Sequence, residues 1–179
     1  MRYVLAPLAG FTDAPFRRLC FEGGADLTYT EMVSAAGLAH GSSPTRHLME
    51  TMPGEGPVAC QVFGAKETDL AQAAREVESV RSRFVELNLN AGCPMEKVTH
   101  GGAGAKLIED PALVYRLLTA LRENTSLPVT LWDERRTTVD AHNILLGNGK
   151  RAKERKKTVD AVAASLMLEG YLTFKKRQQ

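Results

Sequence analysis

The chain has little cysteine and no long apolar run. Its 179 residues include three cysteines, Cys20, Cys60 and Cys93, with no Cys-x-x-Cys pair. An odd number without paired spacing suggests neither a disulfide framework nor a zinc site, so we expect reduced thiols. No apolar run reaches the roughly 18 residues of a membrane-spanning helix, and the first residues lack the apolar stretch of a signal peptide. These absences predict a cytoplasmic protein without a membrane partner.

An excess of charge of one sign is also missing. The chain has 23 basic and 21 acidic residues, a formal net charge of +2, which is too small to indicate a nucleic-acid partner. Basic residues do gather at 150–157 and 175–177. Such runs are usually solvated surface, and contact with RNA is the alternative. With 44% hydrophobic and 25% charged residues, the composition is that of a globular protein rather than a disordered one.

Strand and helix patterns alternate along the chain. Apolar and β-branched runs predict strands at 4–10, 27–33, 57–64, 85–89 and 127–132. Helices are expected after Thr12 or Asp13, near 35–38, along the face Leu70, Ala73, Ala74 and Val77, at 111–118 after Asp110, and as an amphipathic segment at 157–174. This alternation predicts an α/β fold, with a parallel sheet of about five strands in half-barrel order. A complete eight-stranded barrel needs about 250 residues, more than are present.

One predicted strand runs into the turn Gly92-Cys93-Pro94. Parallel sheets bind ligands at the carboxyl ends of their strands, where Asn88, Asn90 and Cys93 are expected to lie. A lone cysteine there more often closes a strand as a small apolar residue. A thiol on a turn beside amide side chains is nevertheless a candidate acid or nucleophile.

Five blocks of residues resemble the tRNA-dihydrouridine synthases, which are flavoenzymes of the TIM-barrel class. Residues 90–94, followed by Lys97-Val98 and a glycine-rich run at 101–105, are similar to the signature loop of that family. The other blocks occur in the family's order: Ala6-Pro7-Leu8-Ala9-Gly10 with Thr12-Asp13, Pro15-Phe16-Arg17, the run 30–34, and Gln61 in its strand. The resemblance covers about residues 3–130. It implies a first domain, 1–130, that forms the N-terminal half of a TIM barrel.

The resemblance also implies a reaction and its participants. FMN would be the cofactor, NADPH its reductant and tRNA the substrate, with uridine reduced to dihydrouridine. Cys93 would protonate C5 of the uracil while hydride passes from reduced flavin to C6. The backbone of Ala6, Pro7 and Leu8 would lie against the isoalloxazine ring, and Gln61 and Asn90 would hydrogen-bond its edge. The alternative role for Gln61 is to satisfy backbone groups within the sheet.

The second half departs from that family, since the strand at 128–132 lacks the lysine that should reach the flavin. Residues 132–141 and 156–172 resemble instead the pre-16S-rRNA nuclease family, which has an RNase H-like fold and is related to Holliday-junction resolvases. This implies a second segment, 131–179, packed on the same sheet. Glu134 and Asp160 would be metal-binding carboxylates there, and capping or surface roles are as frequent. A third carboxylate from an early strand is missing.

Three functions follow from these resemblances. The first is an FMN-dependent tRNA-dihydrouridine synthase, impaired because the last barrel strands, whose loops hold the flavin phosphate, are absent. The second is a nuclease or RNA-binding remnant, and the third is a folded but inactive chimera. A half barrel exposes a sheet edge and an apolar face. We therefore expect either the tail helices or a second copy of the chain, in a homodimer, to cover the open half barrel.

Overall fold

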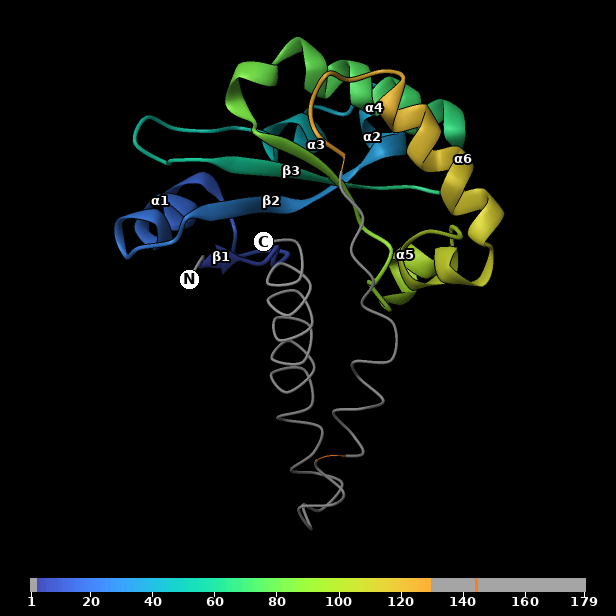
Figure 1. The fold of residues 1–179 in the computed structure, drawn as a ribbon, viewed down its shortest axis with the longest axis horizontal. Helices are drawn as coiled ribbons and strands as arrows, with labels where there is room; N and C mark the ends of the chain where they lie inside the picture. The colour runs from blue at the N-terminus through green and yellow to red at the C-terminus, as the bar shows by residue number, and fades with distance from the viewer. Residues whose placement is uncertain (1–2, 130–143, 145–179) are drawn as a thin grey trace, which may run out of the picture. The chain divides into compact units, whose positions relative to one another are not determined.

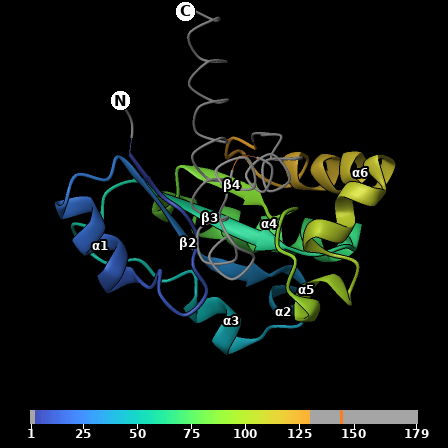
Figure 2. The same ribbon diagram turned by 90° about the horizontal axis from the view of Figure 1, so that it is seen from below.

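Four parallel strands in chain order form the sheet in the described part of the chain (Figure 1). A computed structural model describes residues 3–129 and Ile144. The chain divides after Thr130, so all of these residues except Ile144 belong to its first unit. The strands are β1 (Val4–Leu5), β2 (Leu27–Ser34), β3 (Val58–Phe63) and β4 (Glu86–Leu89). Each strand lies beside the next one in sequence (Figure 2), which is the order of a barrel wall rather than of a doubly wound sheet.

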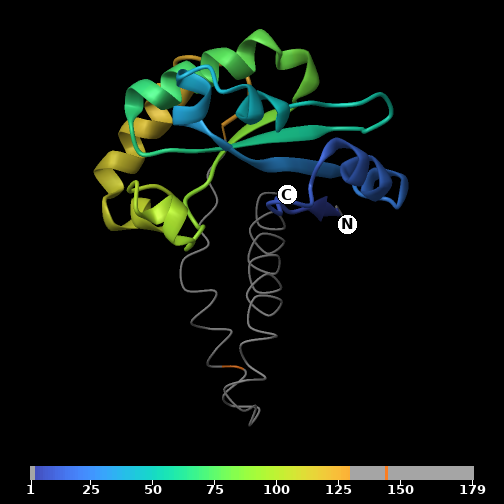
Figure 3. The same cartoon turned by 180° about the vertical axis from the view of Figure 1, so that it is seen from behind.

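Helices connect the strands. The structure forms α1 (Ala14–Glu22), α2 (Ala35–Ala39), α3 (Ser43–His47), α4 (Glu67–Ser79), α5 (Glu96–Thr99) and α6 (Pro111–Arg122), with 3-10 turns at η1 (Arg81–Arg83) and η2 (Gly104–Glu109). Opposite views place α2, α4 and α6 on the same side of the sheet (Figures 1 and 3). The result is an α/β fold with a parallel sheet, consistent with part of a TIM barrel.

The core lies between this helix layer and the sheet. The predicted face of α4 is confirmed, because Leu70, Ala73, Ala74 and Val77 are all fully buried. They belong to one cluster with Cys60 of β3 and other side chains of the same sheet face. Side chains alternate between the two faces of a strand. Polar residues of β3 and β4 that alternate with the core residues therefore lie on the opposite face.

The first strand is shorter than the sequence pattern predicts, since it ends at Leu5 rather than Gly10. Pro7 has no N–H with which to continue the ladder. The chain instead turns back, and the N–H groups of Phe11 and Thr12 both donate to the Leu8 carbonyl oxygen at 3.0 Å. Of the two predicted caps of the first helix, Asp13 is the one that caps α1.

The predicted fifth strand starts at the margin of the described residues. The Leu87 N–H donates to the Pro128 carbonyl oxygen at 3.1 Å, so the chain returns beside β4 at that point. Glu78 at the end of α4 fixes the segment that leads to this strand, because its carboxylate accepts hydrogen bonds from Thr125 and Ser126. The hydrogen bond from the Ser126 N–H is the main reason that the pKa of the Glu78 carboxyl is lowered. Residues 130–132, the predicted helix at 157–174 and most of the nuclease-like segment lie outside the described residues.

Candidate functional site

Three amide side chains form a hydrogen-bonded row toward the carboxyl ends of β3 and β4. Gln61 lies opposite Asn88 in the strand register, and its Nε2 donates to Asn88 Oδ1 at 2.8 Å. Asn90 follows β4, and its Nδ2 donates to Gln61 Oε1 at 3.1 Å. The two amides predicted to meet the flavin thus contact each other. Asn88 was expected beside Asn90 at the carboxyl end of this strand, but no role toward the flavin was predicted for it.

Asn90 also holds the loop that carries Cys93. Its Oδ1 accepts hydrogen bonds from the backbone N–H groups of Gly92, at 3.3 Å, and Cys93, at 3.0 Å. Asparagine often stabilises a turn through such bonds to the residues that follow it. The Asn90 N–H itself continues the sheet ladder by donating to the Val62 carbonyl oxygen at 2.8 Å. The backbone of Cys93 is therefore fixed relative to the end of β4.

The glycine-rich run at 101–105 packs closely against the Cys93 loop. The Ala105 N–H donates to the Cys93 carbonyl oxygen at 3.0 Å. Gly104, beside it, has a φ of +60°, and a Cβ built there would lie 2.4 Å from that same oxygen. Only glycine fits both the left-handed backbone and the close approach. The glycine-rich run after the signature turn thus forms a support for the Cys93 loop.

The amide row keeps hydrogen-bond donors for a ligand. The bonds found among the described residues use one N–H of Gln61 and one of Asn90, and each side-chain amide carries two. Both lone-pair directions of Asn90 Oδ1 are engaged by backbone N–H groups. The row thus suits a ring edge rich in carbonyl oxygens and unprotonated nitrogens. These side chains fit the edge of a flavin or a pyrimidine.

The loop after β1 is held at the same end of the sheet. Its predicted cofactor-binding residues are Ala6, Pro7 and Leu8, and Leu8 is 49% exposed. The Leu8 N–H donates to Thr12 Oγ1 at 3.1 Å, and that hydroxyl is also 3.2 Å from the Leu8 carbonyl oxygen. Because the strands are parallel, the loops after β1 and β4 both follow carboxyl ends. The backbone groups of residues 6–8 and the side chains of the amide row therefore both lie on the carboxyl-end side of the sheet.

The three thiols differ in accessibility. Cys93 and Cys20 are half-buried, whereas Cys60 is fully buried in the cluster beneath the helices. Burial raises the pKa of the Cys60 thiol to about 12, although a hydrogen bond with Thr30 and the charge of Arg17 lower it in part. Cys60 is therefore protonated at neutral pH and faces away from the amide row.

We expect Cys60 to make the folded chain less stable at alkaline pH. Its pKa in the folded state lies above the ordinary value of 9.0, so folding favours the protonated thiol. That contribution is complete below pH 9 and decreases by about 1.4 kcal/mol per pH unit as the pH rises toward 12. Cys60→Ala should remove this decrease, and Cys20→Ala should retain it. Urea unfolding midpoints between pH 7 and 10 measure the difference, and equal alkaline slopes in parent and Cys60→Ala would contradict it.

A polar pocket is lined by residues of α3, of η1 and of the segment that follows α3. Its lining includes Arg46 and His47 of α3 and Arg83 of η1, which precede β3 and β4 in the chain. None of the lining residues belongs to the amide row or to the Cys93 loop.

Neither a metal site nor a membrane-spanning helix occurs in the described part of the chain. Among residues 3–129 and Ile144, no three His, Cys, Asp or Glu side chains gather closely enough to hold a metal ion. No helix found there is both long and apolar enough to cross a membrane. Glu134 and Asp160, which are metal ligands only in the alternative nuclease-like interpretation, lie outside the described residues, as does the basic run at 150–157.

Comparison with known proteins gives a consistent set of relatives. The family model described as "Dihydrouridine synthase (Dus)" matches residues 4–154, beyond residue 130, where the resemblance in the sequence ended. The tRNA-dihydrouridine synthase B of Xanthomonas axonopodis pv. citri (strain 306) is 36% identical over 137 residues, which is 74% of this chain and 41% of that protein. The tRNA-dihydrouridine synthase B of Escherichia coli (strain K12) is 38% identical over 130 residues, which is 73% of this chain and 40% of that protein. A probable tRNA-dihydrouridine synthase of Helicobacter pylori (strain ATCC 700392 / 26695) is 36% identical over 126 residues. The chain spans about two fifths of the length of these curated relatives.

Proposed function

Because this chain belongs to the dihydrouridine synthase family, we propose that it reduces uridine to dihydrouridine in tRNA with FMN as cofactor and NADPH as reductant. The observation that carries the proposal is the hydrogen-bonded row of Gln61, Asn88 and Asn90 joined to the Cys93 backbone. It combines donors for a ring edge with a thiol on the adjacent turn. Those are the two requirements of the reaction that this part of the chain can meet.

Each residue has a distinct part in the proposed reaction. FMN, when bound and reduced, supplies the hydride that is added to C6 of the uracil. Cys93 donates the proton to C5, so that one hydride and one proton are added across the C5–C6 double bond and the thiolate remains. Gln61 and Asn90 donate to the cofactor edge with their remaining N–H groups. The backbone of Ala6, Pro7 and Leu8 supports the ring, and Asn90 keeps the Cys93 loop in place.

The test follows the flavin and then the tRNA. The purified chain is reconstituted with FMN, reduced with NADPH in the absence of oxygen, and mixed with unmodified tRNA. We expect tRNA-dependent reoxidation of the flavin and dihydrouridine in the tRNA by mass spectrometry. A parent chain without either result would overturn the proposal. Cleavage of RNA that requires Mg²⁺ and is lost in Asp160→Ala would favour the nuclease-like function, and a folded chain without either activity would indicate an inactive chimera.

We further propose that two copies of the chain associate to cover the open half barrel. Domain 1–130 would supply the half barrel, and residues 131–179 would form a second segment. Among residues 3–129, β1 is an edge strand with two residue pairs to β2. Tyr3 and Val4 at this edge are 61% and 48% exposed, and Leu19 of α1 is 65% exposed. Apolar side chains along such a sheet edge favour association. A monomeric mass in sedimentation equilibrium, with and without FMN, would contradict this arrangement.

A further inference from the structure

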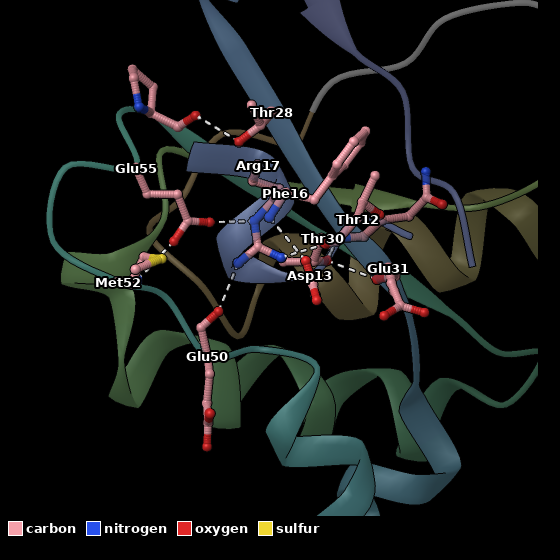
Figure 4. Close-up of polar contacts among 12 residues, drawn as sticks. Thr12, Asp13, Phe16, Arg17, Thr28, Thr30, Glu31, Glu50, Met52 and Glu55 are labelled. Atoms are coloured by element: carbon pink, nitrogen blue, oxygen red, sulfur yellow. Dashed lines mark hydrogen bonds and ion pairs between the residues drawn. The ribbon is translucent and has the colours of Figure 1, made fainter. Parts of the chain in front are cut away.

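A buried ion pair joins the loop after β1 to a distant part of the chain. Arg17 is the buried residue of α1, with 1% of its side chain exposed, and Glu55 is 2% exposed. The two residues are 38 positions apart, and Arg17 Nε donates to Glu55 Oε1. Figure 4 shows the guanidinium directed into a set of oxygen acceptors. Neither residue contributes to the site described so far.

The guanidinium contacts two backbone carbonyl groups in addition to the carboxylate. Nη1 donates to the Thr12 carbonyl oxygen at 2.6 Å, and Nη2 donates to the Glu50 carbonyl oxygen at 2.7 Å (Figure 4). The second oxygen of Glu55 accepts from the Met52 N–H at 2.8 Å. Arg17 therefore fixes the end of the β1–α1 loop, while Glu55 fixes the segment that leads to β3.

Thr12 links the Arg17–Glu55 pair to residues 6–8 in the loop after β1. That residue is fully buried, and its hydroxyl and N–H bond to the backbone of Leu8. A Thr12 carbonyl held by Arg17 thus fixes the position of Leu8. Burying an ion pair brings little net stability, since a well-packed apolar pair of similar volume is often as stable. What an apolar pair lacks is the planar fork of donors that Arg17 directs at two carbonyl groups.

We propose that the Arg17–Glu55 pair is a positioning device that holds the backbone of Leu8, and with it residues 6–8, in place against the flavin. This inference rests on the proposed function for its connection to FMN. The positioning of Leu8 by Arg17 can be measured with or without the cofactor. Arg17 acts here through Thr12 and touches neither cofactor nor substrate.

The central variant replaces both members of the pair, as Arg17→Met with Glu55→Met in the full chain. It leaves no unpaired buried charge, but it removes the partners of the Thr12 and Glu50 carbonyl groups and of the Met52 N–H. The melting temperature should therefore fall by several degrees, and by less than in Arg17→Met alone. Hydrogen exchange of the Leu8 and Thr12 amides should rise by about tenfold or more, and the dissociation constant of FMN by a similar factor. Arg46→Met, which removes an exposed ion pair with Glu76, is the control and should change neither value.

Arg17→Lys is the second variant in case the double variant does not fold. It keeps a positive charge but has a single ammonium group in place of the planar guanidinium. Hydrogen exchange of the Leu8 amide should therefore rise, while exchange of amides elsewhere in the chain should not. Parent-like exchange at Leu8 in both variants would overturn the inference. A uniform rise that includes the Leu87 amide of β4 would also overturn it, because that pattern indicates a purely structural role. A parent chain that fails to bind FMN would refute the proposed function, while the exchange of Leu8 would still decide whether Arg17 positions the loop.

Discussion

Cys93→Ala is expected to leave flavin binding intact and to abolish most of the reduction of tRNA uridine. The other thiols cannot replace it, because Cys60 is fully buried beneath the helices and Cys20 lies on α1. The backbone N–H of residue 93 still reaches Asn90 Oδ1 in the variant, so the loop and the amide row should keep their geometry. A general acid typically contributes a factor of about 100 to 10,000. We expect a loss in that range for the tRNA-dependent step.

The measurement compares flavin affinity and flavin reoxidation in the same preparations. Unchanged affinity together with slow reoxidation is the pattern of an interaction lost only in the transition state. Cys20→Ala is the matched control, since it removes a half-buried thiol from another element. Equal reoxidation by Cys93→Ala and the parent would refute the assignment of the proton donor.

Gly104→Ala is expected to destabilise the chain and to impair reduction at the same time. The residue has a φ of +60°, which costs a side chain about 1 to 2 kcal/mol. Its Cβ would lie 2.4 Å from the Cys93 carbonyl oxygen and 2.8 Å from Val98 Cγ1. Relief requires movement of the backbone, which adds about 1 to 3 kcal/mol. The hydrogen bond from Ala105 to Cys93 should be lost, and a shift of about 1 Å in a reacting group can reduce a rate about a hundredfold.

Gly101→Ala is the control for this substitution. A Cβ at Gly101 would meet its nearest atom, the Val98 carbonyl oxygen, at 3.7 Å, which is an ordinary contact. Thermal unfolding and tRNA-dependent reoxidation should therefore change much less than in Gly104→Ala. A Gly104→Ala chain with the melting temperature and turnover of the parent would show that the glycine-rich run does not support the Cys93 loop.

The local patterns of the sequence predicted most of the described fold. The face of α4 followed from helical spacing, and Asp110 was predicted as the cap of α6, where it accepts from the Leu113 N–H. Boundaries were less certain, because Pro7 ends β1 early and the short helix α3 has no apolar period that could predict it. Alternation also identifies a face without showing how well it is covered. Val85 remains 47% exposed, although it precedes the buried Leu87 by two positions.

The candidate site could be predicted only in part. Gln61, Asn90 and Cys93 were predicted from a family pattern, and their roles toward FMN remain predictions. The bonds between the amides depend on strand register, which brings together residues 27 and 29 positions apart. Arg17 was noted within a motif, but its partner Glu55 lies in a loop without a recognisable pattern. Long-range pairings of this kind follow from the assembled fold rather than from spacing.

The strand order of the sheet bears on how the chain assembles. Successive strands pair Val4 with Leu27, Thr28 with Val58, and Ala59 with Glu86, so that partners are 23, 30 and 27 residues apart. A closed barrel must also join its first strand to its last, and such distant pairings slow folding because a long loop has to close first. The four described strands require no pairing of that kind. They can therefore form one after another during synthesis on the ribosome, each strand adding to the edge left by the one before it.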